Sequence, residues 1–175
     1  QAVLIDLDGT LMDTVPDLAS AANRMRADFG LAPLATERVA AFVGKGAEVL
    51  IHRALADDLQ GEVEAGRHAA GRESFYRHYH AVNGAEAVVF PQVEEALTLL
   101  DEAGLKLACV TNKPREFTMP LLERMGLAPH FAAVVAGDDV REKKPHPALL
   151  LAACERLGCA PQASLMICDS VNDAL

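Results

Sequence analysis

Two aspartates near the N-terminus have the clearest chemical potential, Asp6 and Asp8 in the string Asp6-Leu7-Asp8-Gly9-Thr10. They close the apolar run 2–7, which is typical of a parallel strand covered on both faces. In open parallel sheets ligands bind beyond the carboxyl ends of the strands, where both aspartates fall. Two carboxylates one residue apart repel each other unless a cation lies between them, and oxygen ligands of this kind suit Mg²⁺. A lone Asp-x-Asp is more often a pair of surface acids. The residues at the later strand ends are therefore needed to decide between a metal site and two surface acids.

The second apolar run, 105–111, ends in Thr111-Asn112. A hydroxyl, an amide and nearby main-chain N–H groups could hold phosphate oxygens there, although a helix cap is the commoner role of such residues. After the third run, 131–137, Lys143 and Lys144 supply two ammonium groups just before a helix. A solvated basic turn is the alternative interpretation.

The fourth run, 164–170, ends in Asp169-Ser170, and Asp173 lies four residues beyond Asp169. That spacing puts both carboxylates on one side of a starting helix. Each strand end has an ordinary explanation when it is taken alone. Together the strand ends form an ordered series of an acid pair, a hydroxyl with an amide, a lysine and a second acid pair.

The elements that must position these groups follow from periodicity. Helical patterns over 93–104, 115–126 and 147–158 separate the later apolar runs, and each pattern stops at a glycine, which is common just past a helix end. Strand, helix and strand at this spacing predict an α/β fold with a Rossmann-like parallel sheet.

The segment 14–84 contains no run typical of a strand. Its pattern predicts four helices, over 14–29, 36–42, 47–57 and 62–82. We therefore expect an all-helical domain, 14–84, inserted into a sheet domain made of 1–13 and 85–175. Four of the six histidines lie in the insertion without a metal-ligand pair spacing, and we expect them to be solvated or packed.

Composition narrows the class of protein. The chain has 175 residues, 51% of them hydrophobic, and a net charge of −9. This length and apolar fraction support a packed core, and the acidic balance argues against nucleic acid or an anionic membrane as the main partner. No apolar run approaches the ~20 residues of a membrane span. Four cysteines without a C-x-x-C pair predict reduced thiols in a cytoplasmic protein.

With these four motifs in order, the chain resembles phosphatases of the haloacid dehalogenase superfamily over essentially its whole length. The helical insertion resembles that family's mobile cap of the first type. The phrases DLDGTLMDTVPDL, FVGKGAEVL, VTNKPREFTMPLLERMGL and KKPHPALLLAACERLG are similar to the phosphoglycolate phosphatases within it. The resemblance implies a small phosphorylated metabolite as substrate, 2-phosphoglycolate first, and a monomer or homodimer.

The resemblance also implies roles for individual residues. Asp6 would be the nucleophile that forms an aspartyl phosphate, and Asp8 the general acid and then the base. Mg²⁺ would be held by the Asp6 side chain, the Asp8 carbonyl oxygen and Asp169. The remaining expected site residues bind the phosphoryl group or support the site: Gly9, Thr111, Asn112, Lys144, Ser170 and Asp173.

Two further expectations concern specificity. Because an alkoxide needs a proton on leaving and a halide does not, Asp8 favours phosphate esters over carbon–halogen bonds. In the cap, Lys45 between Gly44 and Gly46 could meet a carboxylate of the substrate. A solvated lysine in a glycine-flanked turn is the equal alternative.

The sequence also departs from the family pattern. Cys168 stands where relatives usually have glycine before the fourth-motif aspartate, and we expect its side chain to crowd the metal or phosphate. The chain begins at Gln1 and stops at Leu175, before a further helix and strand expected from the family, so we expect a truncated C-terminal end. A sugar-phosphate phosphatase, a phosphoglucomutase-like enzyme and a non-catalytic binding protein are the alternative functions.

Overall fold

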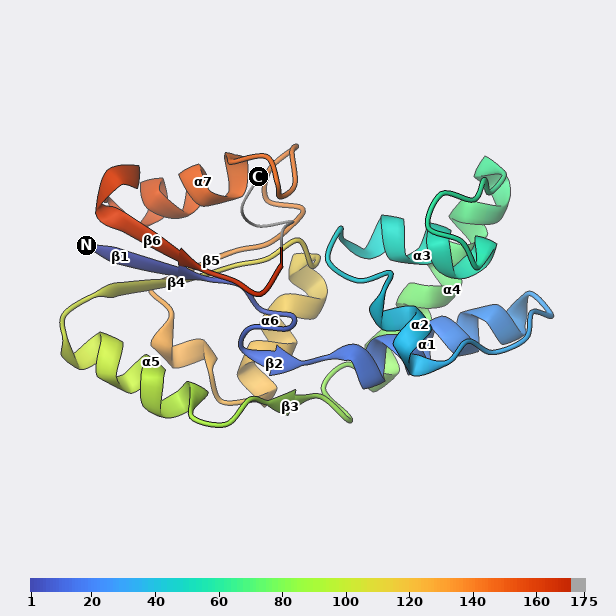
Figure 1. Ribbon diagram of the computed structural model, residues 1–175, viewed down its shortest axis with the longest axis horizontal. Coiled ribbons are helices and arrows are strands. Elements are labelled where there is room, and N and C mark those ends of the chain that lie inside the picture. The colour runs from blue at the N-terminus through green and yellow to red at the C-terminus, as the bar shows by residue number, and fades with distance from the viewer. Residues whose placement is uncertain (171–175) are drawn as a thin grey trace. The chain divides into compact units, whose positions relative to one another are not determined.

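The computed structural model describes residues 1–170, coloured along the chain in Figure 1. The chain forms two compact units. One consists of Gln1–Asp13 with the described residues from Val88 onward, and the other is Thr14–Ala87.

The first unit is built on a four-stranded parallel sheet. Its strands are β1 (Ala2–Ile5), β4 (Lys106–Val110), β5 (Ala133–Val135) and β6 (Ser164–Ile167), in the order β5-β4-β1-β6. Ile5 lies opposite both Cys109 and Ile167, so β1, β4 and β6 end at one edge. Every residue of β1 is buried, as expected for an apolar strand with neighbours on both sides. The predicted α/β class with a parallel sheet is confirmed.

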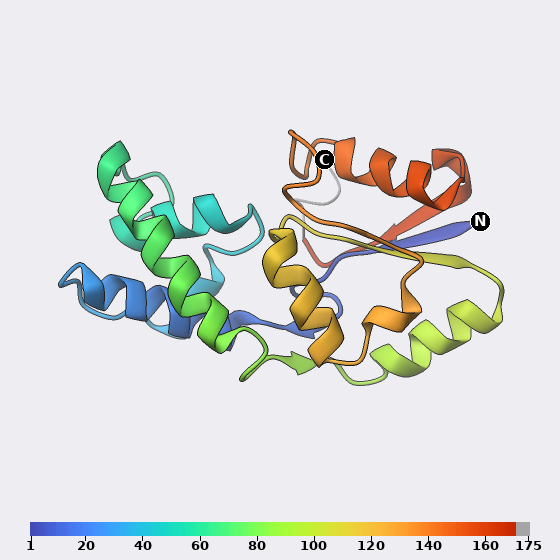
Figure 2. The ribbon, with the colours of Figure 1, turned by 180° about the vertical axis from the view of Figure 1, so that it is seen from behind.

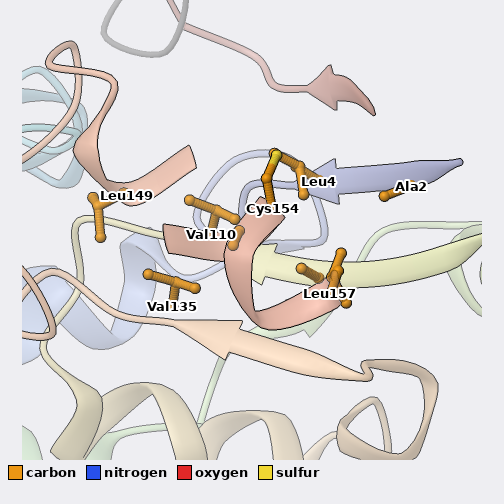
Figure 3. Packing of buried hydrophobic residues seen from close by; sticks show 9 residues of the cluster. Ala2, Leu4, Val110, Val135, Leu149, Cys154 and Leu157 are labelled. Carbon is orange, nitrogen blue, oxygen red and sulfur yellow. The ribbon is translucent and has the colours of Figure 1, made fainter. Parts of the chain in front are cut away.

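Three helices cover the two faces of this sheet: α5 (Val93–Glu102), α6 (Arg115–Arg124) and α7 (Ala148–Leu157). Figure 1 shows α7 on one face and α5 with α6 on the other. Leu149, Ala153 and Leu157 of α7 bury their side chains against strand residues such as Leu4 and Val110, as Figure 3 shows. Two short 3₁₀ turns, Ala128–His130 and Pro161–Ala163, precede β5 and β6.

A short antiparallel pair was not predicted. It joins β2 (Met12–Asp13) to β3 (Val88–Val89), with Met12 opposite Val89. Two-residue strands leave too little alternation in the sequence to be recognised.

The second unit contains four helices and no strand within residues 14–87. They are α1 (Val15–Asp28), α2 (Thr36–Ala40), α3 (Ala47–Ala56) and α4 (Ala65–Val82), and α1 packs along α4 (Figure 2). Phe75 and Tyr79 are buried, with ring centroids 5.4 Å apart. The buried carboxylate of Asp17 accepts hydrogen bonds from the main-chain N–H groups of Gly84 and Glu86, which fixes the chain that follows α4.

Within residues 1–170, none of the helices combines the length and the apolar character that crossing a bilayer would require.

Candidate active site

Three sequence-predicted groups follow neighbouring strands at one edge of the sheet. Asp6 follows β1 directly, and its N–H donates to the carbonyl of Ile167 on β6 over 3.0 Å. Thr111 follows β4, and its N–H donates to the carbonyl of Val135 on β5, also over 3.0 Å. Asp169 lies two residues beyond the end of β6. The parallel register therefore brings the ends of distant segments together.

The carboxylate of Asp6 is paired with a buried lysine. The Nζ atom of Lys144 lies 2.7 Å from Oδ1 of Asp6 and donates to the carbonyl of Val110 over 3.0 Å. The Lys144 side chain is only 2% exposed. A charge removed from water in this way needs a close counter-charge, so Lys144 and Asp6 are held as a pair.

Asn112 fixes the backbone of that lysine. Its Nδ2 donates to the carbonyl of Lys144 over 3.1 Å, and its Oδ1 accepts from the Lys144 N–H over 2.9 Å. The predicted role of this amide in phosphate binding stays a prediction. In the structure both amide atoms contact the Lys144 backbone, so Asn112 positions the lysine.

A second ion pair involves a buried lysine that was not predicted to belong to the site. Nζ of Lys113 lies 2.8 Å from Oδ1 of Asp8, and the two side chains are 4% and 16% exposed. Lys113 directly follows Thr111-Asn112 in the chain. The sequence signal was a lysine adjoining a motif at a strand end, which a single sequence does not distinguish from a solvated lysine.

The loop that carries Lys113 is held at several points. The Lys113 N–H donates to the Thr111 hydroxyl over 3.1 Å, and its carbonyl accepts from the Gly137 N–H over 2.9 Å and from the Thr118 hydroxyl over 3.3 Å. A Cβ on Gly137 would lie 2.1 Å from the carbonyl oxygen of Asn112, so only glycine permits this close approach. The loop and its lysine are thus preorganised.

The loop after β1 lies against Asp169. Gly9 has a φ of 88°, and a Cβ on it would come within 2.4 Å of Oδ2 of Asp169. The hydroxyl of Thr10 donates to Oδ1 of the same carboxylate over 3.1 Å. Gly9 was predicted to bind phosphate, and what the structure shows is that it makes room for Asp169.

The donor set of this sheet edge fits Mg²⁺. Asp6 and Asp169 provide carboxylates, and Asp169 lies against Gly9, the residue after the Asp8 carbonyl. Within residues 1–170, no three His, Cys, Asp or Glu side chains are grouped to hold a metal ion. Mg²⁺ commonly binds through one or two carboxylates with water and phosphate oxygens as its other ligands, and so does not require a third side chain.

The other predicted residues differ in their exposure. Cys168 and Ser170 are half-buried beside Asp169, whereas Asp173 lies outside the described residues. Lys45 is exposed on its own helical unit, and Gly44 and Gly46 have φ values of 105° and 86°.

All four cysteines have free thiols. Cys109 is fully buried beneath the sheet edge, and burial, with a contribution from Asp6, raises the pKa of its thiol. A thiol in this state is a poor nucleophile. Cys109 therefore serves as a small apolar core residue.

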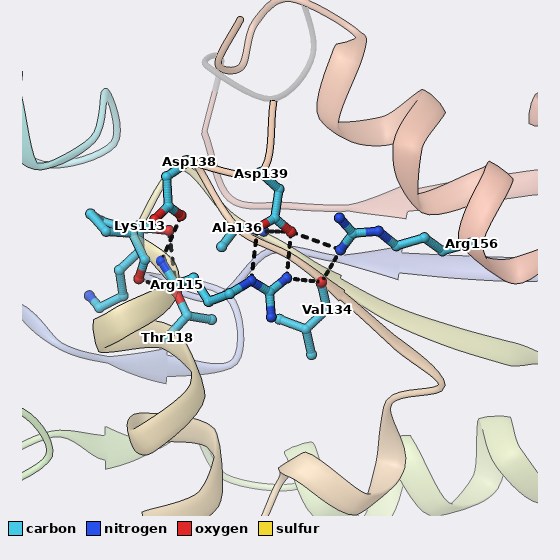
Figure 4. Close-up of polar contacts among 9 residues, drawn as sticks. Lys113, Arg115, Thr118, Val134, Ala136, Asp138, Asp139 and Arg156 are labelled. Atoms are coloured by element: carbon cyan, nitrogen blue, oxygen red, sulfur yellow. Dashed lines mark hydrogen bonds and ion pairs between the residues drawn. The ribbon is translucent and has the colours of Figure 1, made fainter. Parts of the chain in front are cut away.

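A further charged cluster braces the neighbouring strand end (Figure 4). Asp139 accepts hydrogen bonds from Arg115 at the start of α6, from Arg156 of α7 over 2.7 Å and from the Ala136 N–H over 3.2 Å. Hydrogen bonding from Arg115, together with Arg156 and the Ala136 N–H, lowers the pKa of Asp139 to about 2. The cluster joins two helices to the end of β5.

Comparison with known proteins identifies the family. The family model for haloacid dehalogenase-like hydrolases matches residues 1–175. A phosphoglycolate phosphatase of Nitrosospira multiformis is 44% identical over 174 residues, which cover 99% of this chain and 77% of that protein. One of Chromobacterium violaceum is 42% identical over 173 residues, 99% of this chain and 78% of that protein.

Solved structures show the same fold. A predicted phosphoglycolate phosphatase from Haemophilus somnus superimposes with a TM-score of 0.90 at 32% identity, covering 98% of this chain and 78% of that one. The family model and the relatives together extend over nearly the whole sequence. The chain therefore belongs to the haloacid dehalogenase-like hydrolases and is an enzyme, a hydrolase similar to phosphoglycolate phosphatases.

Proposed function

We propose that the protein is a Mg²⁺-dependent phosphatase that hydrolyses 2-phosphoglycolate to glycolate and phosphate through an aspartyl phosphate. The names of its relatives support this substrate. The observation that carries the proposal is the two ion pairs of the buried lysines Lys144 and Lys113, with Asp6 and with Asp8, at one sheet edge.

In the first step, a carboxylate oxygen of Asp6 attacks phosphorus, and the bond between phosphorus and the ester oxygen breaks. Asp8 gives its proton to the departing alkoxide, which leaves as glycolate. In the second step, Asp8 takes a proton from water as that water attacks phosphorus. The acyl phosphate bond then breaks, phosphate leaves, and the Asp6 carboxylate is restored.

The main obstacle is repulsion between a carboxylate and a phosphate dianion, so charge neutralisation matters most. Lys144 is positioned for this, because its ammonium already touches Asp6 at 2.7 Å. The Thr111 hydroxyl and nearby main-chain N–H groups orient the phosphoryl oxygens. Mg²⁺, when held by Asp6, Asp169 and the Asp8 carbonyl, supplies further positive charge to the phosphoryl group, with Ser170 and Asp173 supporting its ligands.

The experiment is a hydrolysis screen over phosphorylated metabolites with and without Mg²⁺, including hexose phosphates for the alternative substrates. We expect the highest kcat/KM on 2-phosphoglycolate and none without the metal. Asp6→Asn should abolish turnover, whereas Asp101→Asn, an exposed aspartate on α5, is the matched control. Activity retained by Asp6→Asn would exclude the covalent route.

A trapping measurement tests the intermediate itself. Acid quenching during turnover of phosphorus-labelled substrate should leave label on the wild-type protein and none on Asp6→Asn. Hydroxylamine should release that label, because it cleaves acyl phosphates. Turnover by the wild type on no substrate would favour a binding protein with this fold instead.

The division of labour between the two units is part of the proposal. The sheet unit would carry the chemistry, and the helical unit would act as the cap that selects substrate through Lys45. Lys45→Met should then lower kcat/KM on 2-phosphoglycolate more than on a neutral aryl phosphate. A monomer or homodimer in the cytoplasm is the expected form of the protein.

A further inference from the structure

We propose that Lys113 is a specificity-determining residue, whose ammonium binds an anionic group on the leaving-group side of the substrate, such as the carboxylate of 2-phosphoglycolate. This inference rests on the proposed function and deepens it. It adds a group on the sheet unit to the anion recognition that we propose for Lys45 of the helical unit.

The position of Lys113 relative to Asp8 is the first argument. In the proposed reaction Asp8 faces the ester oxygen that leaves, and Nζ of Lys113 lies 2.8 Å from Oδ1 of Asp8. The carboxylate carbon of 2-phosphoglycolate is two bonds from that ester oxygen. A group so close to the leaving oxygen falls within reach of the same ammonium. A sugar phosphate would place a neutral carbon or hydroxyl there.

Charge and burial are the second argument. Lys144 pairs with Asp6, the residue that attacks phosphorus, whereas Lys113 pairs with Asp8, the residue that faces the leaving oxygen. Its side chain is 4% exposed, and little water weakens its attraction for an anion. An ammonium has three N–H donors, so it can bond Asp8 and a substrate carboxylate oxygen together.

Preorganisation is the third argument. Three hydrogen bonds hold the Lys113 backbone. Its N–H donates to the Thr111 hydroxyl, and its carbonyl accepts from the Gly137 N–H and from the Thr118 hydroxyl. A long side chain anchored at its base and bonded at its tip loses little further freedom on binding. Such a lysine is suited to binding an anionic group at a fixed position, whereas an exposed lysine is not.

The test compares two substrates of similar size that differ in charge, 2-phosphoglycolate and 2-hydroxyethyl phosphate. For Lys113→Met we expect kcat/KM to fall about 10- to 100-fold more on the anionic substrate than on the neutral one. Lys113→Arg should recover part of the preference, because it keeps the charge. Lys143→Met is the matched control and should leave the ratio unchanged, and thermal unfolding checks that each variant folds.

The outcomes separate this inference from the proposed function. Equal losses on both substrates, or a preference that disappears in Lys45→Met and persists in Lys113→Met, would overturn the role of Lys113 while leaving the phosphatase intact. A wild type that hydrolyses both substrates equally would also overturn it. Hydrolysis of neither substrate would reject the proposed function, and this inference with it.

Discussion

The side chain of Lys144 is held in place beside Asp6, the proposed nucleophile. Its ammonium bonds both Asp6 and the Val110 carbonyl in a buried position. We expect Lys144→Met to lower kcat about 10²- to 10³-fold, because it removes a preorganised positive charge from the place where negative charge gathers. Steady-state kinetics at saturating substrate measure this.

The neighbouring lysine provides the control for that prediction. Lys143 precedes Lys144 and is more exposed, so Lys143→Met should keep kcat within a few-fold of the wild type. If both variants lost activity equally, the loss would come from the local charge of the loop, and the specific role of Lys144 would be refuted.

Cys168 allows a prediction in the opposite direction. It lies between the end of β6 and Asp169, and we expect its thiol to crowd metal or phosphate. Cys168→Gly should raise kcat/KM a few-fold and lower the Mg²⁺ concentration needed for half-maximal rate. A Mg²⁺ titration of both forms measures this, and an unchanged or higher requirement for the metal would show that the thiol does not obstruct the site.

The sequence indicated Asp6, Asp8, Thr111, Lys144 and Asp169 because each follows an apolar run. It did not indicate Lys113, because its importance depends on a contact with Asp8, 105 residues away along the chain. Nor did it indicate that the amide of Asn112 bonds the Lys144 backbone. Long-range pairing of this kind is set by the fold and leaves no local pattern in one sequence.

At the level of elements, periodicity predicted the main strands and the helices of the sheet unit with ends displaced by at most three residues. The predicted helix 115–126, for example, is observed as Arg115–Arg124. The glycines marked the helix ends to within two residues: α5 and α6 end two residues before Gly104 and Gly126, and α7 ends directly before Gly158. The β2–β3 pair was missed because two-residue strands carry too little pattern.

The loop between β4 and α6 depends on a glycine from another element. Gly137→Ala would force a Cβ against the carbonyl of Asn112, and the loop that carries Thr111 and Lys113 would have to shift. We expect unfolding free energy to fall by about 1–3 kcal/mol and kcat/KM to fall with it. Urea unfolding and kinetics measure the two effects. Full activity with lowered stability would show that the site tolerates the displacement.

For the whole molecule, the relatives and the sequence pattern agree on one architecture. The superposition on the Haemophilus somnus structure includes 98% of this chain. The net charge of −9 excludes little about the site, because the groups there are locally balanced pairs. The net charge of the molecule therefore bears on which classes of partner it attracts. The individual ion pairs, with contacts of about 3 Å, bear on the chemistry of the site.

Asp139 connects charge to the stability of the whole molecule, because its carboxylate joins α6, α7 and the end of β5. Its pKa is lowered from 3.8 to about 2 in the folded protein. A depressed folded pKa stabilises the native state above the unfolded pKa, and that stabilisation is lost as pH falls through the folded value. It should amount to about 2 kcal/mol at neutral pH, since the side chain is only 9% exposed.

We therefore expect Asp139→Asn to lower the free energy of unfolding by about 2 kcal/mol at pH 7 and by progressively less as the pH falls from about 4 toward 2. Urea unfolding of both forms at a series of pH values measures the difference between their free energies of unfolding. Taking this difference removes the contribution of the other carboxylates, which both forms share. The exposed Asp101 supplies the control, because Asp101→Asn should give a small difference at every pH. A difference between Asp139→Asn and the wild type that stayed constant from pH 7 to 2 would contradict the ionic coupling, because an uncharged contact would not titrate.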